Sequence, residues 1–117
     1  MNKSLNELQQ LVVQAAEEKQ ARDILVLDLR NRSDLTDCFI ICSGNSSLQV
    51  RAIADSILEQ IAPSPYKAYA IEGYSPGHWI VLDLEDVVVH VFNEETRRHY
   101  DLERLWGDVP IIDAVGT

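Results

Sequence analysis

The stretch HWIVLDLEDVVVHVF (residues 78–92) contains two runs of branched aliphatic residues separated by an acidic pair, Glu85-Asp86. Successive side chains of a β-strand point to opposite sides, and both runs fit that alternation. Two residues between strands make the shortest common hairpin connection, which places Glu85 and Asp86 in the turn. The stretch therefore predicts an antiparallel hairpin with strands 79–84 and 87–92.

The register of this hairpin sorts its side chains into two different faces, because directly opposite residues in an antiparallel pair share a face. One face is wholly aliphatic and predicts core; it carries Ile80, Leu82, Leu84, Val87, Val89 and Val91. We call the other side the mixed face. It pairs Trp79 with Phe92, Val81 with His90, and Asp83 with Val88.

The mixed face has more than one interpretation. Large aromatic residues among a few polar groups are typical of partner-binding surfaces. Alternatively, a helix covers this face, as in many mixed sheets, and local hydrogen bonds satisfy Asp83 and His90 within the fold. In that case His90 is a packing residue fixed by Asp83. A homodimer that uses the mixed face is a further alternative, compatible with partner binding.

The N-terminal half of the chain predicts one helix and two strands. Leucine, valine and alanine recur at helical spacing over residues 4–20, with Ser4 as the cap and Glu7 at the capping-box position. ILVLDLR (24–30) alternates apolar and polar residues and predicts a half-buried strand. CFIICS (38–43) is almost wholly apolar, which is typical of a central strand.

The remaining segments complete a single α/β domain over residues 1–117. A second helix runs to about Ile61, a strand is expected over 66–73, and 93–107 predicts one or two short helices. The tail, 109–117, has no clear period and is expected to lack regular structure. Helices that alternate with strands in a chain of this length predict one mixed β-sheet with flanking helices.

Composition favours a protein partner over nucleic acid. The chain has 10 Lys and Arg against 19 Asp and Glu, a net charge of −9. An acidic surface repels phosphate backbones and attracts basic proteins, although solubility alone also explains such a charge. No apolar run approaches the roughly 20 residues that span a membrane, and no export signal is present, so a cytoplasmic protein is expected. Cys38 and Cys42 are expected to be buried free thiols, and no metal or cofactor site is predicted.

An enzymatic alternative is a small transferase that uses magnesium for nucleotidyl or phosphoryl transfer. It would combine Asp28, Asp83 and Ser43, with His90 nearby, around the turn CSGNSS (42–47). That turn has one glycine and no following lysine, and its polar residues are sufficiently explained as helix caps. Asp83 also lacks a second acid close by on its own strand. We therefore expect a chain that is not an enzyme.

The segment RRHYDLERLWGD (97–108) adds aromatic residues that could reach the mixed face. Tyr100 and Trp106 are spaced so that part of each could border Trp79 and Phe92. The alternative is structural: Leu102, Leu105 and Trp106 would anchor the last helix on the sheet.

Four segments together resemble the ribosomal silencing factor (Iojap) family. They are LTDCFIICSGNSS (35–47), IEGY (71–74), WIVLDLEDVVVHVF (79–92) and EETRRHYDLERLWGD (94–108), and the resemblance covers about residues 5–108 in order. The chain departs from the family pattern at Cys38, where an aromatic residue is common, and at Glu85, where glycine is common.

The resemblance implies a fold like that of nucleotidyltransferases without their catalytic residues. It also implies a factor that binds the large ribosomal subunit through its protein number fourteen, a basic protein, blocks joining of the small subunit and represses translation under stress. Relatives in organelles act in ribosome assembly. The residues expected to contact the partner are Trp79, Asp83, His90, Phe92, Tyr100, Glu103 and Trp106; Asp83 and Glu103 would pair with its Lys or Arg side chains.

Overall fold

Six strands form one mixed sheet in the computed structural model, which describes residues 5–30, 36–100 and 110–115. The strand order is β3-β4-β5-β2-β1-β6; β2 and β5 run parallel, and every other neighbouring pair is antiparallel. The elements are α1 (Glu7–Glu18), β1 (Arg22–Asp28), β2 (Cys38–Gly44), α2 (Ser47–Ile61), β3 (Ala70–Glu72), β4 (Trp79–Asp83), β5 (Val87–Asn93), α3 (Glu94–Tyr100) and β6 (Ile111–Val115). The predicted α/β class, with a mixed sheet and flanking helices, is confirmed.

The predicted hairpin register is confirmed in every pair. Trp79 lies opposite Phe92, Val81 opposite His90, and the pairing closes with a hydrogen bond of 2.9 Å from the Leu84 amide to the Val87 carbonyl. The aliphatic face is buried throughout: Ile80, Leu82, Leu84, Val87, Val89 and Val91 all belong to the main core.

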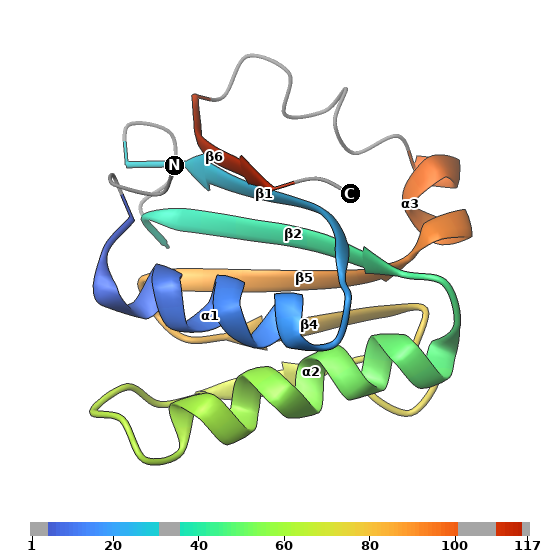
Figure 1. Ribbon diagram of the computed structural model, residues 1–117, viewed down its shortest axis with the longest axis horizontal. Helices are drawn as coiled ribbons and strands as arrows, with labels where there is room; N and C mark the ends of the chain where they lie inside the picture. Colours follow the sequence, from blue (N-terminus) through green and yellow to red (C-terminus); the bar gives the residue numbers. More distant parts are fainter. Residues whose placement is uncertain (1–4, 31–35, 101–109, 116–117) are drawn as a thin grey trace.

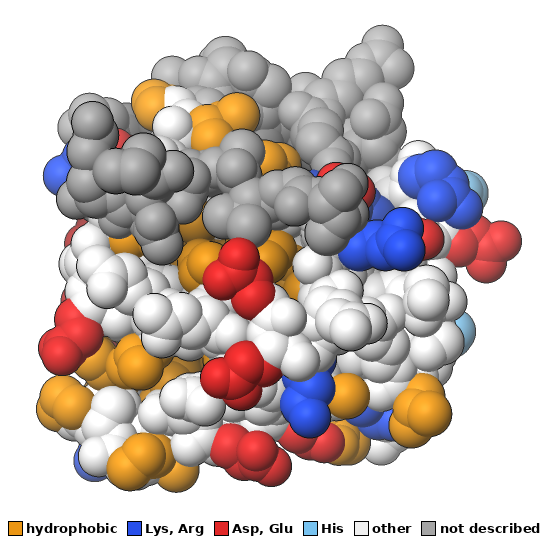
Figure 2. All heavy atoms as spheres, viewed as in Figure 1, with side chains coloured by type: hydrophobic (Ala, Val, Ile, Leu, Met, Phe, Trp, Pro, Cys, Tyr) orange, Lys and Arg blue, Asp and Glu red, His pale blue; other side chains and the backbone are white. Residues whose placement is uncertain are grey.

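The two long helices cover this aliphatic side of the sheet. Figure 1 shows α1 and α2 side by side across one face, where they pack on β1, β2, β4 and β5. The buried stripe of α2 includes Val50, Ile53, Ala54 and Ile57, as its spacing predicted. Glu7, Glu17 and Glu18 of α1 and Glu59 of α2 are exposed, and Figure 2 shows carboxylates scattered over this side of the molecule.

Three details of the expected secondary structure are wrong. The cap of α1 is Asn6, not Ser4: Asn6 Oδ1 accepts from the Gln9 amide at 2.8 Å, and Gln9 Oε1 accepts from the Asn6 amide at 3.0 Å. The strand expected over 66–73 contains only the three residues of β3. The tail contains β6, which pairs with β1 and extends the sheet.

β1 is more deeply buried than the alternation predicted. Ile24 and Val26 enter the main core, while Leu27 and the following Leu29 are buried on the opposite side of the sheet. A strand with β2 on one edge and β6 on the other is central, and central strands carry apolar residues on both sides. The correct description of β1 is a strand buried on two faces.

Both cysteines are buried free thiols. Burial raises the pKa of Cys38 and of Cys42 to about 12, because the charged thiolate loses its hydration. Among the residues described, none of the helices is long and apolar enough to cross a membrane.

The turn of the hairpin holds Glu85 in the left-handed region, with φ of 77°. A positive φ at the first of two turn residues is the pattern of a type II′ turn, which favours glycine. Glu85→Gly should therefore raise the free energy of unfolding by about 0.5–1 kcal/mol, measured by denaturant titration. Asp86, whose φ is not positive, is the matched control: Asp86→Gly should not stabilise the chain, and a gain for both variants would refute this explanation.

Candidate functional site

Four rings from three neighbouring strands pack together on the mixed face. We call Phe39 of β2, Trp79 of β4, and His90 and Phe92 of β5 the aromatic cluster. The ring centres of Trp79 and Phe92 are 4.8 Å apart, and those of Phe39 and His90 are 4.5 Å apart in a T-shaped arrangement. Such contacts orient the rings beyond what burial alone requires. The cluster is a preorganised aromatic surface on the sheet.

Trp79 is the exposed member of the cluster. The residue is 37% exposed to solvent, and its indole N–H donates a hydrogen bond of 3.1 Å to Nδ1 of His90. The indole therefore packs against the ring of Phe92 and is oriented by its hydrogen bond to His90. An exposed tryptophan in a fixed orientation loses little conformational entropy on binding, which suits it as an interface anchor.

Phe92 does not fit its predicted role as a contact residue. It is fully buried, with 0% exposure, and belongs to a second small core with Leu27, Leu29 and Ile41. The expectation is corrected: Phe92 supports the ring of Trp79 and offers no surface of its own. The mixed face is therefore buried around Leu27, Ile41 and Phe92, and its accessible part lies around Trp79 of β4.

His90 interacts with Trp79 and not, as one alternative held, with Asp83. An indole N–H only donates, so Nδ1 of His90 must accept, and a neutral ring then carries its proton on Nε2. That Nε2 is buried and has no hydrogen-bond partner among the described residues. Desolvation by burial lowers the pKa of His90 to about 4, so the imidazole is neutral near pH 7.

Carboxylates border the accessible part of the mixed face. Asp83 is half-buried, and its Oδ1 accepts the Glu85 amide at 2.9 Å, which fixes the carboxylate at the start of the turn. Glu72 of β3 lies opposite Val81, so it shares this face and is exposed. Asp83 is thus exposed enough to pair with a cationic side chain of a partner.

Sequence reasoning missed two residues of this region. Phe39 was assigned to a core strand, and only the parallel pairing of β2 with β5 brings it beside Val88 and against His90. Arg97 is buried and donates from Nη1 to the Asp23 carbonyl at 2.9 Å and to Ser43 Oγ at 2.7 Å. Arg97 thereby ties α3 to the ends of β1 and β2. The pattern of a basic residue in a short helix gave no sign of this burial.

Three other predicted contact residues lie wholly or partly outside the described residues. Tyr100 is the last residue of α3, and its side chain is not among those described. Glu103 and Trp106 fall within 101–109, which the structure does not describe. Their roles remain predictions.

The residues of the enzymatic alternative are not brought together. Asp83 lies on β4 on the mixed face, whereas Asp28 lies on β1 opposite Cys38, on the helix-covered side. Ser43 is on the mixed face but is buried, with its hydroxyl bonded to Arg97. Among the described residues, no three His, Cys, Asp or Glu side chains are grouped closely enough to hold a metal ion.

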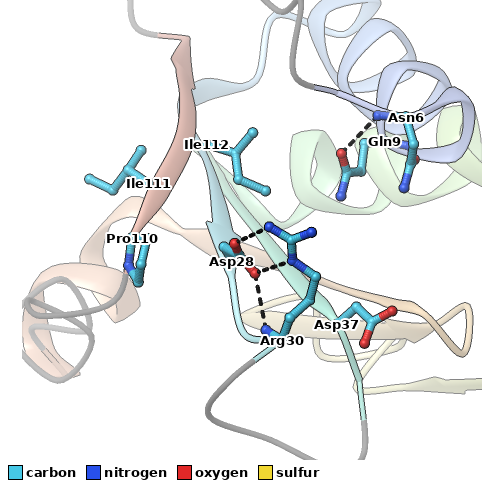
Figure 3. A pocket seen from close by; sticks show the side chains of 8 residues that line it. All are labelled: Asn6, Gln9, Asp28, Arg30, Asp37, Pro110, Ile111 and Ile112. Carbon is cyan, nitrogen blue, oxygen red and sulfur yellow. Dashed lines mark hydrogen bonds and ion pairs between the residues drawn. The ribbon is translucent and has the colours of Figure 1, made fainter.

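Asp28 instead lines a pocket of about 560 Å³ between β1, β6 and the start of α1. Figure 3 shows Arg30 folded back over the Asp28 carboxylate, with bonds of 2.9 Å from Nε and 2.7 Å from Nη2. These hydrogen bonds, with one from the Arg30 amide, lower the pKa of Asp28 to about 2. Because Arg30 engages both carboxylate oxygens, the Asp28 carboxylate is already satisfied within the chain.

Neutral His90 should make stability depend on pH. Its pKa is about 4 when folded and near the ordinary 6.5 when unfolded, so the unfolded chain binds the proton more readily. The stability from this group is complete above about pH 6.5 and falls by up to about 3 kcal/mol as the pH drops toward 4. His90→Phe should flatten this part of the curve in denaturant titrations across that range. The control is His78→Phe, a substitution of an exposed histidine, which should leave the fall in stability in place. An equal fall in stability in wild type and in His90→Phe would contradict this account.

The chain matches a known protein family over nearly its whole length. Residues 2–116 match the family model described as "Ribosomal silencing factor during starvation". A ribosomal silencing factor of Halalkalibacterium halodurans is 41% identical to this chain over 114 residues, which cover 97% of each chain. A ribosomal silencing factor of Bacillus subtilis is 46% identical to it over 99 residues, which cover 85% of this chain and 84% of the relative. A mouse protein named for mitochondrial assembly of the ribosomal large subunit is 31% identical over 101 residues, covering 82% of this chain and 43% of its own.

A solved structure shows the same fold. The crystal structure of a Chromobacterium violaceum protein superposes with a TM-score of 0.83 at 35% identity, covering 86% of this chain and 84% of the other. The match to the family model extends over nearly the whole chain. The chain therefore belongs to the ribosomal silencing factor family.

Proposed function

We propose that this protein binds the large ribosomal subunit through the accessible part of its mixed face and thereby represses translation. The partner is a basic ribosomal protein, number fourteen of that subunit in the family resemblance, at the surface where the small subunit docks. A bound domain at that surface prevents joining by steric exclusion. The observation that carries this proposal is the exposed indole of Trp79, which contacts His90 and Phe92 on the same face as the carboxylates of Glu72 and Asp83.

Charge supports a basic partner. Residues 68–96, which include β3, β4 and β5, contain no Lys or Arg. The same segment carries Glu72, Asp83, Glu85, Asp86, Glu94 and Glu95. Complementary charge speeds encounter and suppresses wrong partners, while the aromatic anchor supplies most of the affinity. A cationic protein surface fits this half of the sheet, and an exposed phosphate backbone does not.

Family membership supports the ribosome as the target. The bacterial relatives are named as ribosomal silencing factors, and the mouse relative is named for assembly of the mitochondrial large subunit. Both names concern the ribosome, and one names its large subunit. A protein that occupies the subunit-joining surface can serve either process, because both require that the small subunit be kept off this surface until a later step.

Trp79→Ala should abolish the interaction while leaving the fold intact. Removal of a central aromatic anchor typically costs at least about 2 kcal/mol, or roughly thirtyfold in affinity. Co-sedimentation with purified large subunits measures this loss. Leu48→Ala is the matched control, because Leu48 is 73% exposed and lies on α2, away from the mixed face.

The same preparations test the mechanism. Wild type added to large subunits should reduce their association with small subunits in a sucrose gradient, whereas Trp79→Ala should not. Retained binding by Trp79→Ala would remove the mixed face from the interface. Binding without any effect on subunit association would refute steric exclusion and leave the docking site intact.

A further inference from the structure

The exposed apolar side chains gather at one edge of the sheet. Six large hydrophobic residues are exposed in the described part of the chain, and four of them fall within residues 69–79: Tyr69, Ile71, Tyr74 and Trp79. We call Tyr69, Ile71 and Tyr74 the edge strip. It follows β3, which ends the strand order and has no outer neighbour among the described strands. Edge strands that expose apolar residues pair readily with other chains.

We propose that the β3 edge binds an extended basic segment of a protein partner as an added strand. This proposal rests on the proposed function and defines which partner structure lies next to Trp79. Strand addition uses backbone hydrogen bonds for affinity and the alternating side chains for specificity.

The two sides of β3 differ in chemistry, and this difference specifies the segment. Ile71 lies opposite Leu82 and faces the helix-covered side, where it is 46% exposed. Glu72 lies opposite Val81 and faces the mixed face. Because side chains alternate along a strand, a segment beside β3 would place apolar residues against Ile71 and basic residues against Glu72. The occupant is therefore a strand of alternating apolar and Lys or Arg residues.

Charge around the edge strip favours a cation. Glu85, Asp86 and Asp83 lie close enough to Tyr69 to raise the pKa of its hydroxyl, chiefly through the charge of Glu85. A raised tyrosine pKa reports a negative potential at that point of the surface, since the potential disfavours the phenolate. The edge strip thus combines apolar area with negative potential, and a second, equally acidic copy of this chain matches it poorly.

The edge is held in place before any partner arrives. Tyr74 donates to the Asp55 carboxylate of α2 at 2.9 Å, and Arg51 of α2 donates to the Ser75 carbonyl at 2.9 Å. Gly73, with φ of 77°, lies so close to Trp79 that a Cβ would be 2.2 Å from the Trp79 carbonyl oxygen. These contacts fix the loop between β3 and β4, so the edge strip is preorganised. Ile71 lies on the helix-covered side of this edge and Trp79 on the mixed face.

A labelled peptide of about ten residues that alternates valine and lysine tests the proposal without the ribosome. Fluorescence anisotropy should show binding to wild type, and hydrogen exchange should show new protection of the amides of residues 70–72. Ile71→Lys should weaken binding at least about tenfold. Leu48→Lys, which adds the same charge at a residue that is 73% exposed and lies away from the edge, should leave binding unchanged. Glu72→Lys should weaken binding and reduce its salt dependence.

Several outcomes would overturn the proposal. They are binding without protection at 70–72, equal binding of a valine–glutamate peptide, equal effects of Ile71→Lys and Leu48→Lys, or protection of β3 through self-association of the chain alone. Co-sedimentation with large subunits separates this proposal from the proposed function. If wild type binds subunits, Trp79→Ala does not, and Ile71→Lys binds normally, the docking face stands and the added strand is wrong.

Discussion

The antiparallel pairing of β4 with β5 is the constraint on which the rest of the structure depends. One register places six aliphatic side chains under α1 and α2, and a slip of one residue would turn them toward solvent and bury Asp83 and His90 in their place. The free energy of the main core therefore fixes the orientation of the opposite face. Because side chains alternate along β4, the burial of Ile80 and Leu82 in the core places Trp79 on the opposite face, where it is exposed.

Patterns that involve neighbouring residues could be predicted from the sequence. The hairpin register follows from period two and a two-residue connection, and the α2 stripe follows from helical spacing, because each depends on residues close together in the chain. The burial of both sides of β1 could not be predicted, since it depends on β6 from the far end of the chain. Local spacing places the cap of α1 at Ser4, two residues before the Asn6 that the structure uses.

The candidate site was predictable to the same degree. Trp79 and His90 lie diagonally on one face of a single hairpin, and their hydrogen bond is a local consequence of that pairing. Phe92 was misassigned because its burial arises from Leu27 and Ile41, on strands that are distant in sequence. Phe39 was missed for the same reason, since a parallel pair carries no turn that would reveal its register.

The two buried thiols have a practical consequence. Only the thiolate reacts with alkylating or oxidising agents, and at pKa values of about 12 it is scarce in the folded chain. Cys38 and Cys42 sit in the middle strand of the core, so a reagent reaches them only when β2 separates from its neighbours. Their rate of modification therefore measures how often this sheet opens, and it does so without any label attached to the protein.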